Sequence, residues 1–279
     1  MTLSQRINHI IGTIARQSIV IGATLLSLFP VYFMTVSAFK TKTEYIADKF
    51  GLPQSLYLDN FTTAFAGEKF LIRFANSGIL TIGSVGLSLI IACLAAYAFA
   101  RMEFKGKQVI FNLLLSLMVV PPVVVVVPLF VSMAKINMVN TYHGTILIYT
   151  GLMMPFSTYL MTNFFRTIPH EIMDAARIDG ASNFGVFLRI ILPLSAPAMI
   201  TLIVVNAMWA WNELLIALVF MQKDNLKTLM VGIAALRSKN YVDIPATMAG
   251  MLIATVPLVI VYLFGQKYFI RGLTAGAVK

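Results

Sequence analysis

Residues 171–193 read EIMDAARIDGASNFGVFLRIILP, a charged segment between two long apolar stretches. Pro169 and Glu171 suit the first turn of a helix, because proline there lacks only a donor that is already unpaired and a carboxylate favours the positive helix end. Gly180 predicts the end of this helix, and the Ser182 hydroxyl can cap a second one. The sequence therefore predicts a helix–turn–helix elbow over about residues 167–193, suited to docking on a partner protein.

The composition indicates an integral membrane protein. Of the 279 residues, 59% are hydrophobic and 11% charged, and the mean hydropathy of +0.85 is too high for a soluble domain of this size. Residues 123–127 are apolar throughout, which excludes the alternating pattern of a barrel strand. A helix needs about 20 apolar residues to cross a membrane, and six stretches qualify: residues 17–39, 76–100, 109–133, 144–165, 191–220 and 247–264.

The basic residues set the expected orientation. The net charge of +10 is spread over many short loops rather than one stripe, which argues against a nucleic-acid partner. Arg101, Lys105 and Lys107 share one short loop, whereas Lys135 stands alone in the next. Positive charge in short loops marks the cytoplasmic side. Both termini and the elbow are therefore expected in the cytoplasm, and a loop at about residues 41–75 outside it.

The chain lacks the chemistry of an ATPase or a metalloenzyme. It has no glycine-rich loop ending in Gly-Lys-Ser or Gly-Lys-Thr, and no metal-binding spacing among His9, His143 and His170. Cys93 is the single cysteine, so no internal disulfide can form. We therefore expect no catalytic residue, no metal and no cofactor bound by this chain.

The elbow carries a resemblance to a known family. Three of its motifs resemble the EAA loop of permeases in binding-protein-dependent ABC importers: Asp174-Ala175-Ala176, Asp179-Gly180-Ala181 and Leu192-Pro193. The family usually has Glu where this chain has Asp174, one methylene shorter. Other motifs resemble the maltose-type, carbohydrate-uptake branch: Phe29-Pro30, Ser37-x-Phe39-Lys40, Ala96-Tyr97-Ala98-x-Ala100-Arg101, Phe104-x-Gly106, Trp211-Asn212-Glu213, and a tail from Arg271 to Lys279.

The resemblance implies a fold and a set of partners. It implies an all-α polytopic membrane protein with six transmembrane helices of the type I ABC importer permease fold, and a single permease domain over residues 1–279. The partners would be a second homologous permease, two cytoplasmic ATPases that use ATP and Mg²⁺, an extracytoplasmic solute-binding protein, and the lipid of a bacterial inner membrane. The cargo would be a mono- or oligosaccharide. A polyol phosphate or a polyamine is the alternative, because the elbow is shared across substrates.

The resemblance also implies roles for individual residues. The expected ATPase-coupling set is Glu171, Asp174, Ala175, Ala176, Arg177, Asp179, Gly180, Ala181, Leu192 and Pro193. A possible substrate path or subunit interface is formed by Trp209, Trp211, Asn212 and Glu213.

Two interpretations of the second set stay open. Tryptophan faces are good platforms for sugar rings, and an ionisable group at membrane depth usually faces a pathway or a partner. Alternatively, the tryptophans belong to the aromatic belt at the membrane surface, and Glu213 pairs with a basic residue of the other permease.

Two other classes of membrane protein fit less well. An ion-coupled secondary transporter would need buried acids near the bilayer midplane, and apart from Glu213 the spans lack them. A channel or scaffold should show a repeated pore segment or a large soluble domain, and neither is visible in the sequence.

Overall fold

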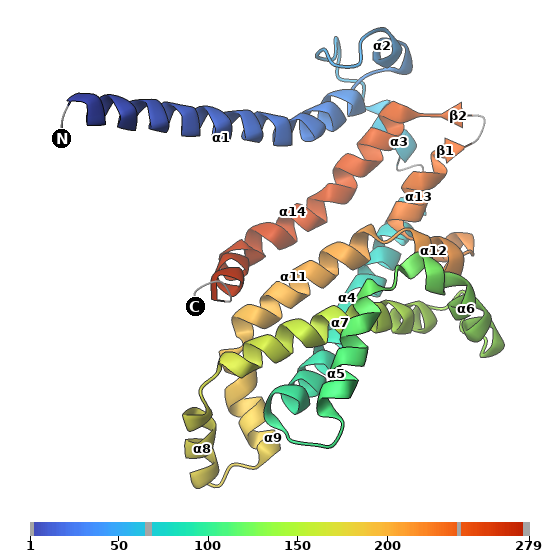
Figure 1. Cartoon of the computed structure of the whole chain (residues 1–279). Helices are drawn as coiled ribbons and strands as arrows, with labels where there is room; N and C mark the ends of the chain where they lie inside the picture. Colours follow the sequence, from blue (N-terminus) through green and yellow to red (C-terminus); the bar gives the residue numbers. More distant parts are fainter. Residues whose placement is uncertain (1–2, 65–68, 239–240, 276–279) are drawn as a thin grey trace. The chain divides into compact units, whose positions relative to one another are not determined.

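The computed structural model describes residues 3–64, 69–238 and 241–275, and nearly all of this chain is helical (Figure 1). The chain forms two compact units, one of residues 1–67 with 233–254 and one of residues 68–232 with 255–279. The prediction of an all-helical membrane protein is confirmed. The exception is a two-residue antiparallel pair, β1 (Arg237–Ser238) and β2 (Tyr241–Val242), in which Arg237 lies opposite Val242.

The first unit begins with the long helix α1 (Leu3–Ala38), whose apolar side chains are largely exposed, as expected of a helix that faces lipid. The short helices α2 (Lys42–Ala47) and α3 (Asp59–Ala64) follow. The buried Asn60 side chain donates hydrogen bonds of 2.8 and 2.7 Å to the carbonyls of Ala38 and Lys40. These bonds satisfy carbonyls that the end of α1 leaves without a helical partner.

A fixed turn follows α2. The buried Lys40 ammonium donates to the Asp48 carbonyl at 2.7 Å. The Asp48 carboxylate accepts hydrogen bonds from the backbone amides of Gly51 and Phe50, and these bonds lower the pKa of Asp48. The residues that the sequence places in a loop therefore contain ordered local structure.

The second unit is built on three long helices: α4 (Lys69–Arg101), α7 (Tyr142–Thr167) and α11 (Ala196–Asn212). Helix α4 packs most extensively against α7, and α11 packs against both. The side chain of Asn206 joins all three helices, because its amide donates to Ser157 of α7 at 2.9 Å and to Ser88 of α4 at 3.3 Å. Buried hydroxyl and amide groups thus replace aliphatic packing along part of this interface.

The stretch predicted over residues 109–133 is broken. It consists of α5 (Lys107–Ser116), the short helix η1 (Leu117–Val119) and α6 (Pro122–Lys135), and the two longer pieces are bent by 106°. Pro121 and Pro122 explain the break, since proline removes a backbone donor and forces the preceding residue into an extended conformation.

The stretch predicted over residues 191–220 also departs from one helix. It contains α10 (Leu192–Leu194), α11 and α12 (Leu215–Phe220), and a 72° bend separates residues 183–194 from α11. Helix α4 begins at Lys69, within the loop predicted at about residues 41–75. Lys69 and Lys227 pair with the Asp224 carboxylate at 2.9 and 3.1 Å, which stabilises the first charged turn of α4.

The remaining elements complete the chain: η3 (Asp224–Leu226), α13 (Leu229–Ala235) and α14 (Ile244–Ala275). In the described residues, three helices satisfy length and composition criteria for a membrane span alone, namely the apolar parts of α1, α4 and α14, and two bent pairs bring the total to five. The remaining predicted stretch, residues 144–165, corresponds to α7, whose buried side includes several threonines and one serine.

Candidate functional site

The predicted elbow lies between α7 and α11. Helix α8 (His170–Ile178) starts after Pro169, Asp179 is its C-cap, and Gly180 adopts a left-handed φ of 84°. The Gly180 amide donates to the Arg177 carbonyl at 3.0 Å, and the Ala181 amide donates to the Ala176 carbonyl at 2.9 Å. This pair of bonds is the Schellman motif, which satisfies the last carbonyls of a helix and favours glycine at the left-handed position.

The second half of the elbow begins as the sequence predicts. Ser182 accepts a hydrogen bond from the Gly185 amide at 3.1 Å and caps α9 (Asn183–Val186). A π-helical turn, η2 (Phe187–Ile191), continues into α10, which contains Pro193. We call α8, the turn at 179–182 and α9 the elbow; Figure 1 shows α8 and α9 as an arm at one end of the second unit.

The predicted coupling residues divide by exposure. Their neighbour Met173, which is not one of the predicted residues, is 1% exposed and lies in a core cluster that also contains Tyr97 of α4 and Phe165 of α7. Three predicted residues are half-buried and pack against this cluster: Ala176, Ala181 and Leu192. The others are exposed: Glu171, Asp174, Ala175, Arg177, Asp179, Gly180 and Pro193.

The exposed face of α8 carries its own ion pair. Arg177 Nη1 lies 3.1 Å from Asp174 Oδ1, and its Nη2 lies 3.4 Å from Asn183 Oδ1. Both charged side chains are about half exposed, so the pair adds little stability. Asp174 therefore keeps a solvent-facing carboxylate whose position Arg177 fixes.

Sequence reasoning missed two apolar residues on this surface. Ile178 is 87% exposed and Phe184 is 61% exposed. Ile172 of α8 is also 42% exposed. Large apolar side chains on an exposed arm are typical of anchors that fill a partner's groove. The signal in the sequence was the isolated position of Ile178 between Arg177 and Asp179.

The residues of the second predicted set make different contacts within the chain. Trp211 is buried and packs edge-on against Phe74 of α4, at 5.2 Å between ring centroids. Asn212 is exposed and donates to the Met208 carbonyl at 2.8 Å. Only Trp209 and Glu213 point toward α7, where both contact Tyr149.

Glu213 has a structural role in this chain. Its carboxylate accepts hydrogen bonds from the amides of Ile216 and Ala217 at 2.8 and 2.9 Å, at the start of α12. It also accepts a bond of 2.8 Å from the Tyr149 hydroxyl. A carboxylate that binds free amides at a helix start is favoured by both hydrogen bonding and the helix dipole.

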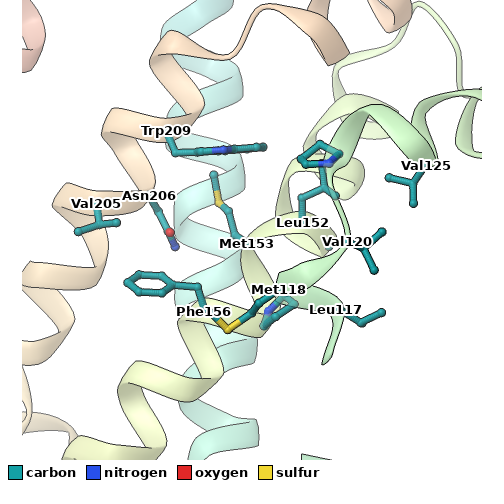
Figure 2. A pocket seen from close by; sticks show the side chains of 13 residues that line it. Leu117, Met118, Val120, Val125, Leu152, Met153, Phe156, Val205, Asn206 and Trp209 are labelled. Carbon is teal, nitrogen blue, oxygen red and sulfur yellow. The ribbon is translucent and has the colours of Figure 1, made fainter. Parts of the chain in front are cut away.

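Trp209 lines a pocket of about 360 Å³ between η1, α6, α7 and α11. Figure 2 shows the ring of Trp209 and the ring of Phe156 on opposite sides of Asn206. The Asn206 amide group is held by Ser88 and Ser157, so its nitrogen is already committed to protein partners. None of the lining residues is ionisable; the others are Leu117, Met118, Val120, Pro122, Val125, Gly151, Leu152, Met153, Pro155 and Val205.

A helical membrane bundle with an exposed elbow between two of its spans is the architecture of an ABC importer permease. The chain belongs to the family of binding-protein-dependent transport system inner membrane components, whose model matches residues 87–275. It is thus a permease subunit of a multi-pass membrane transporter, and the family is not the ATPase of such a system.

Similar proteins agree with this family. A putative ABC transporter permease protein, ORF2, of Caldicellulosiruptor sp. (strain Rt8B.4) is 38% identical over 257 residues, covering 92% of this chain and 93% of that relative. The melibiose/raffinose/stachyose import permease protein MelC of Bacillus subtilis (strain 168) is 36% identical over 251 residues, covering 90% of this chain and 91% of MelC.

A solved structure confirms the fold. One chain of a bacterial ABC transporter involved in import of the acidic polysaccharide alginate superposes with a TM-score of 0.77 at 22% identity, covering 96% of this chain and 99% of that chain. The type I permease fold expected from the sequence is therefore present.

Proposed function

We propose that this permease subunit imports an uncharged mono- or oligosaccharide, delivered by a solute-binding protein and driven by ATP hydrolysis in partner ATPases. The observation that carries the proposal is the elbow, an ordered arm whose tip is exposed and whose base is buried between α4 and α7. The partners are two cytoplasmic ATPases, which use ATP and Mg²⁺, and a second, homologous permease.

The elbow is suited to docking in a groove of an ATPase. Ile178 and Phe184 would fill the groove, and Asp174 with Arg177 would bind polar groups at its rim. Rotation of the ATPase on binding ATP would then move the spans on either side of the elbow and open the path outward. This arrangement requires the elbow and both termini in the cytoplasm of a bacterial cell.

Two observations support a carbohydrate cargo. Two of the similar proteins are named for oligosaccharides: MelC for melibiose, raffinose and stachyose, and AraQ of Halalkalibacterium halodurans, 34% identical over 258 residues, for arabinooligosaccharides. The lining of the pocket pairs aromatic rings with an amide and carries no formal charge. Phosphate recognition calls for Arg or Lys, and a polyamine calls for carboxylates. An uncharged pocket therefore favours a sugar over both alternatives.

Trp209 and Asn206 are the proposed contacts of this subunit with the sugar. A tryptophan face packs against the apolar face of a sugar ring. With its nitrogen held by two serines, the Asn206 amide presents its oxygen as an acceptor for a sugar hydroxyl.

Co-purification tests the importer assembly. The chain is expressed with its neighbouring genes, extracted in mild detergent, and the bound proteins are identified, for the wild type, I178D and the conservative control I178V. We expect an ATPase with the wild type and with I178V, and its loss with I178D. A wild-type chain that purifies alone and transports down an ion gradient would overturn the proposal.

An uptake panel tests the cargo. Proteoliposomes containing the assembled complex are supplied with binding protein and with neutral oligosaccharides, a polyol phosphate or a polyamine. We expect ATP-dependent uptake of a neutral sugar alone, reduced at least about tenfold by W209A, because loss of a stacking ring removes on the order of 1.4 kcal/mol or more. W209F, which keeps a ring, should retain most of the uptake. Uptake of the charged solutes instead would contradict the assignment.

A further inference from the structure

The last turn of α4 contacts both sides of the elbow. Arg101, the final residue of α4, donates to the carbonyls of Phe165 and Ile168, where α7 ends. Its other terminal nitrogen lies 2.9 Å from His170 Nε2, in the first residue of α8. A guanidinium can only donate, so the imidazole nitrogen is the acceptor.

Tyr97 makes the second connection, one turn earlier on the same face of α4. Its hydroxyl donates to the Asn183 carbonyl at 3.0 Å, at the first residue of α9. Its ring packs against Phe187, with 5.0 Å between centroids, and the residue is 6% exposed. Residues 97 and 101 are four apart, which places both side chains on one face of a helix.

We propose that Tyr97 and Arg101, here called the α4 clamp, are positioning residues that make α4 move with the elbow when ATP binds. This inference rests on the proposed function of the elbow and adds the residues that transmit its motion. Chain connectivity alone links α8 to α7 and α9 to α10. The α4 clamp adds a third helix, which the sequence places about 70 residues away from the elbow.

The chemistry of the two contacts explains how they hold. The carbonyls at a helix end are unpaired and carry partial negative charge, so a cation donating to several of them is favoured. The fork of the guanidinium lets Nη2 donate to the two carbonyls while Nη1 donates to His170, which the single nitrogen of a lysine ammonium does not match. Because Met173 also anchors α8 in the core shared with Tyr97, a displaced elbow cannot leave α4 in place without breaking these contacts.

The α4 clamp is not proposed to bind the cargo, so the test measures the response of the complex to ATP. Hydrogen exchange is measured on the assembled permease–ATPase complex with and without ATP, for the wild type, Y97F, R101Q and R101K. Residues 205–209 of α11 report on the pocket, and residues 170–181 report on docking of the elbow. The matched controls are Y159F and R166Q, at exposed positions of α7.

We expect ATP to change exchange at residues 205–209 in the wild type and in both controls. In Y97F this change should shrink about fivefold, the factor that corresponds to one net hydrogen bond of about 1 kcal/mol. R101Q should lose more than Y97F, and R101K should fall between wild type and R101Q. Protection of residues 170–181 by the docked ATPase should remain in every variant.

The outcomes separate the two proposals. If the wild type shows no ATP response at residues 205–209 and no protection of the elbow, the proposed coupling function itself fails. If the wild type responds and both Y97F and R101Q respond equally well, the elbow couples without the α4 clamp and the inference is overturned. Lower thermal stability with an unchanged ATP response would assign the two side chains to folding alone, which also overturns it.

Discussion

Replacing Gly180 perturbs the elbow through its backbone alone. The φ of Gly180 is 84°, and a Cβ added there would meet no heavy atom within 4 Å. Any effect of G180A therefore comes from the left-handed conformation, which costs a residue with a Cβ about 1–2 kcal/mol. Asparagine tolerates this region better, and a β-branched residue tolerates it least. We expect G180N to be the least damaging, G180A intermediate and G180V the most damaging.

The free-energy cost of each substitution can be measured at two backbone amides. The amides of Gly180 and Ala181 close the Schellman motif, so their hydrogen exchange reports local opening of the turn. A loss of about 1–2 kcal/mol in G180A should speed exchange of both amides by about 5- to 30-fold. Uptake in proteoliposomes should fall in the same order across the three variants, while the amount of protein in the membrane stays constant.

A matched glycine provides the control. Gly86 lies inside α4, and an added Cβ there also meets nothing within 4 Å, but its φ is not left-handed. G86A should leave the elbow amides unchanged, because alanine is favoured over glycine within a helix. Equal exchange and uptake in wild type and G180V, or equal damage by G180N and G180V, would refute the argument from backbone conformation.

Three further predictions concern other parts of the second unit. E213Q should lower the free energy of unfolding by about 1.5–3 kcal/mol, because the carboxylate that accepts from Tyr149 and two amides of α12 is replaced by a neutral amide; thermal unfolding in detergent measures this, and an unchanged midpoint would contradict it. N206L should cost about 1 kcal/mol, the scale of two interhelical hydrogen bonds in a membrane bundle, and chemical unfolding against wild type checks it. The hydrogen bonds from Lys69 and Lys227 lower the pKa of Asp224 to about 2. The stability that Asp224 adds over D224N should therefore be constant above pH 4 and disappear as the pH falls toward 2; a difference already lost at pH 4 would be inconsistent with this pKa.

The elbow could be predicted from the sequence because its signals are local. Gly180 and Ser182 act on backbone groups within a few residues, and both take the positions expected of them. The depth of each residue could not be predicted in the same way. Ala176 packs inward while its neighbour Ala175 is exposed, since burial depends on α4 and α7, which lie far away in sequence.

The substrate-path set shows the limit of reasoning from neighbours in sequence. Trp209, Trp211 and Glu213 are close in the chain, but Trp209 and Glu213 share the partner Tyr149, whereas Trp211 packs against Phe74. From the sequence alone, Glu213 is a charged residue within a membrane span, and such residues usually have a function. Its hydrogen-bond partner Tyr149 lies 64 residues earlier, so the structural role of Glu213 could not be inferred from its neighbours in the chain. Asn206, which the structure places in the pocket, has no distinguishing motif around it.

Two of the predicted spans are broken, and the sequence carries a clear signal for only one of the breaks. Pro121 and Pro122 mark an interruption in the sequence, but their effect on direction, a bend of 106°, depends on how α5 and α6 pack. The end of α11 had no proline or glycine signal at all. There the Glu213 carboxylate accepts hydrogen bonds from the free amides at the start of α12, so that a new helix begins where α11 ends.

The polar face of α7 also bears on how the chain enters a membrane. Thr150, Ser157, Thr158 and Thr162 are buried on the side of α7 that packs against its neighbours. In lipid, hydroxyl groups without protein partners would be unfavourable, and α7 does not meet the criteria for a span by itself. We therefore expect α7 to insert together with α4, which is made earlier on the ribosome and packs against α7 more extensively than α11 does.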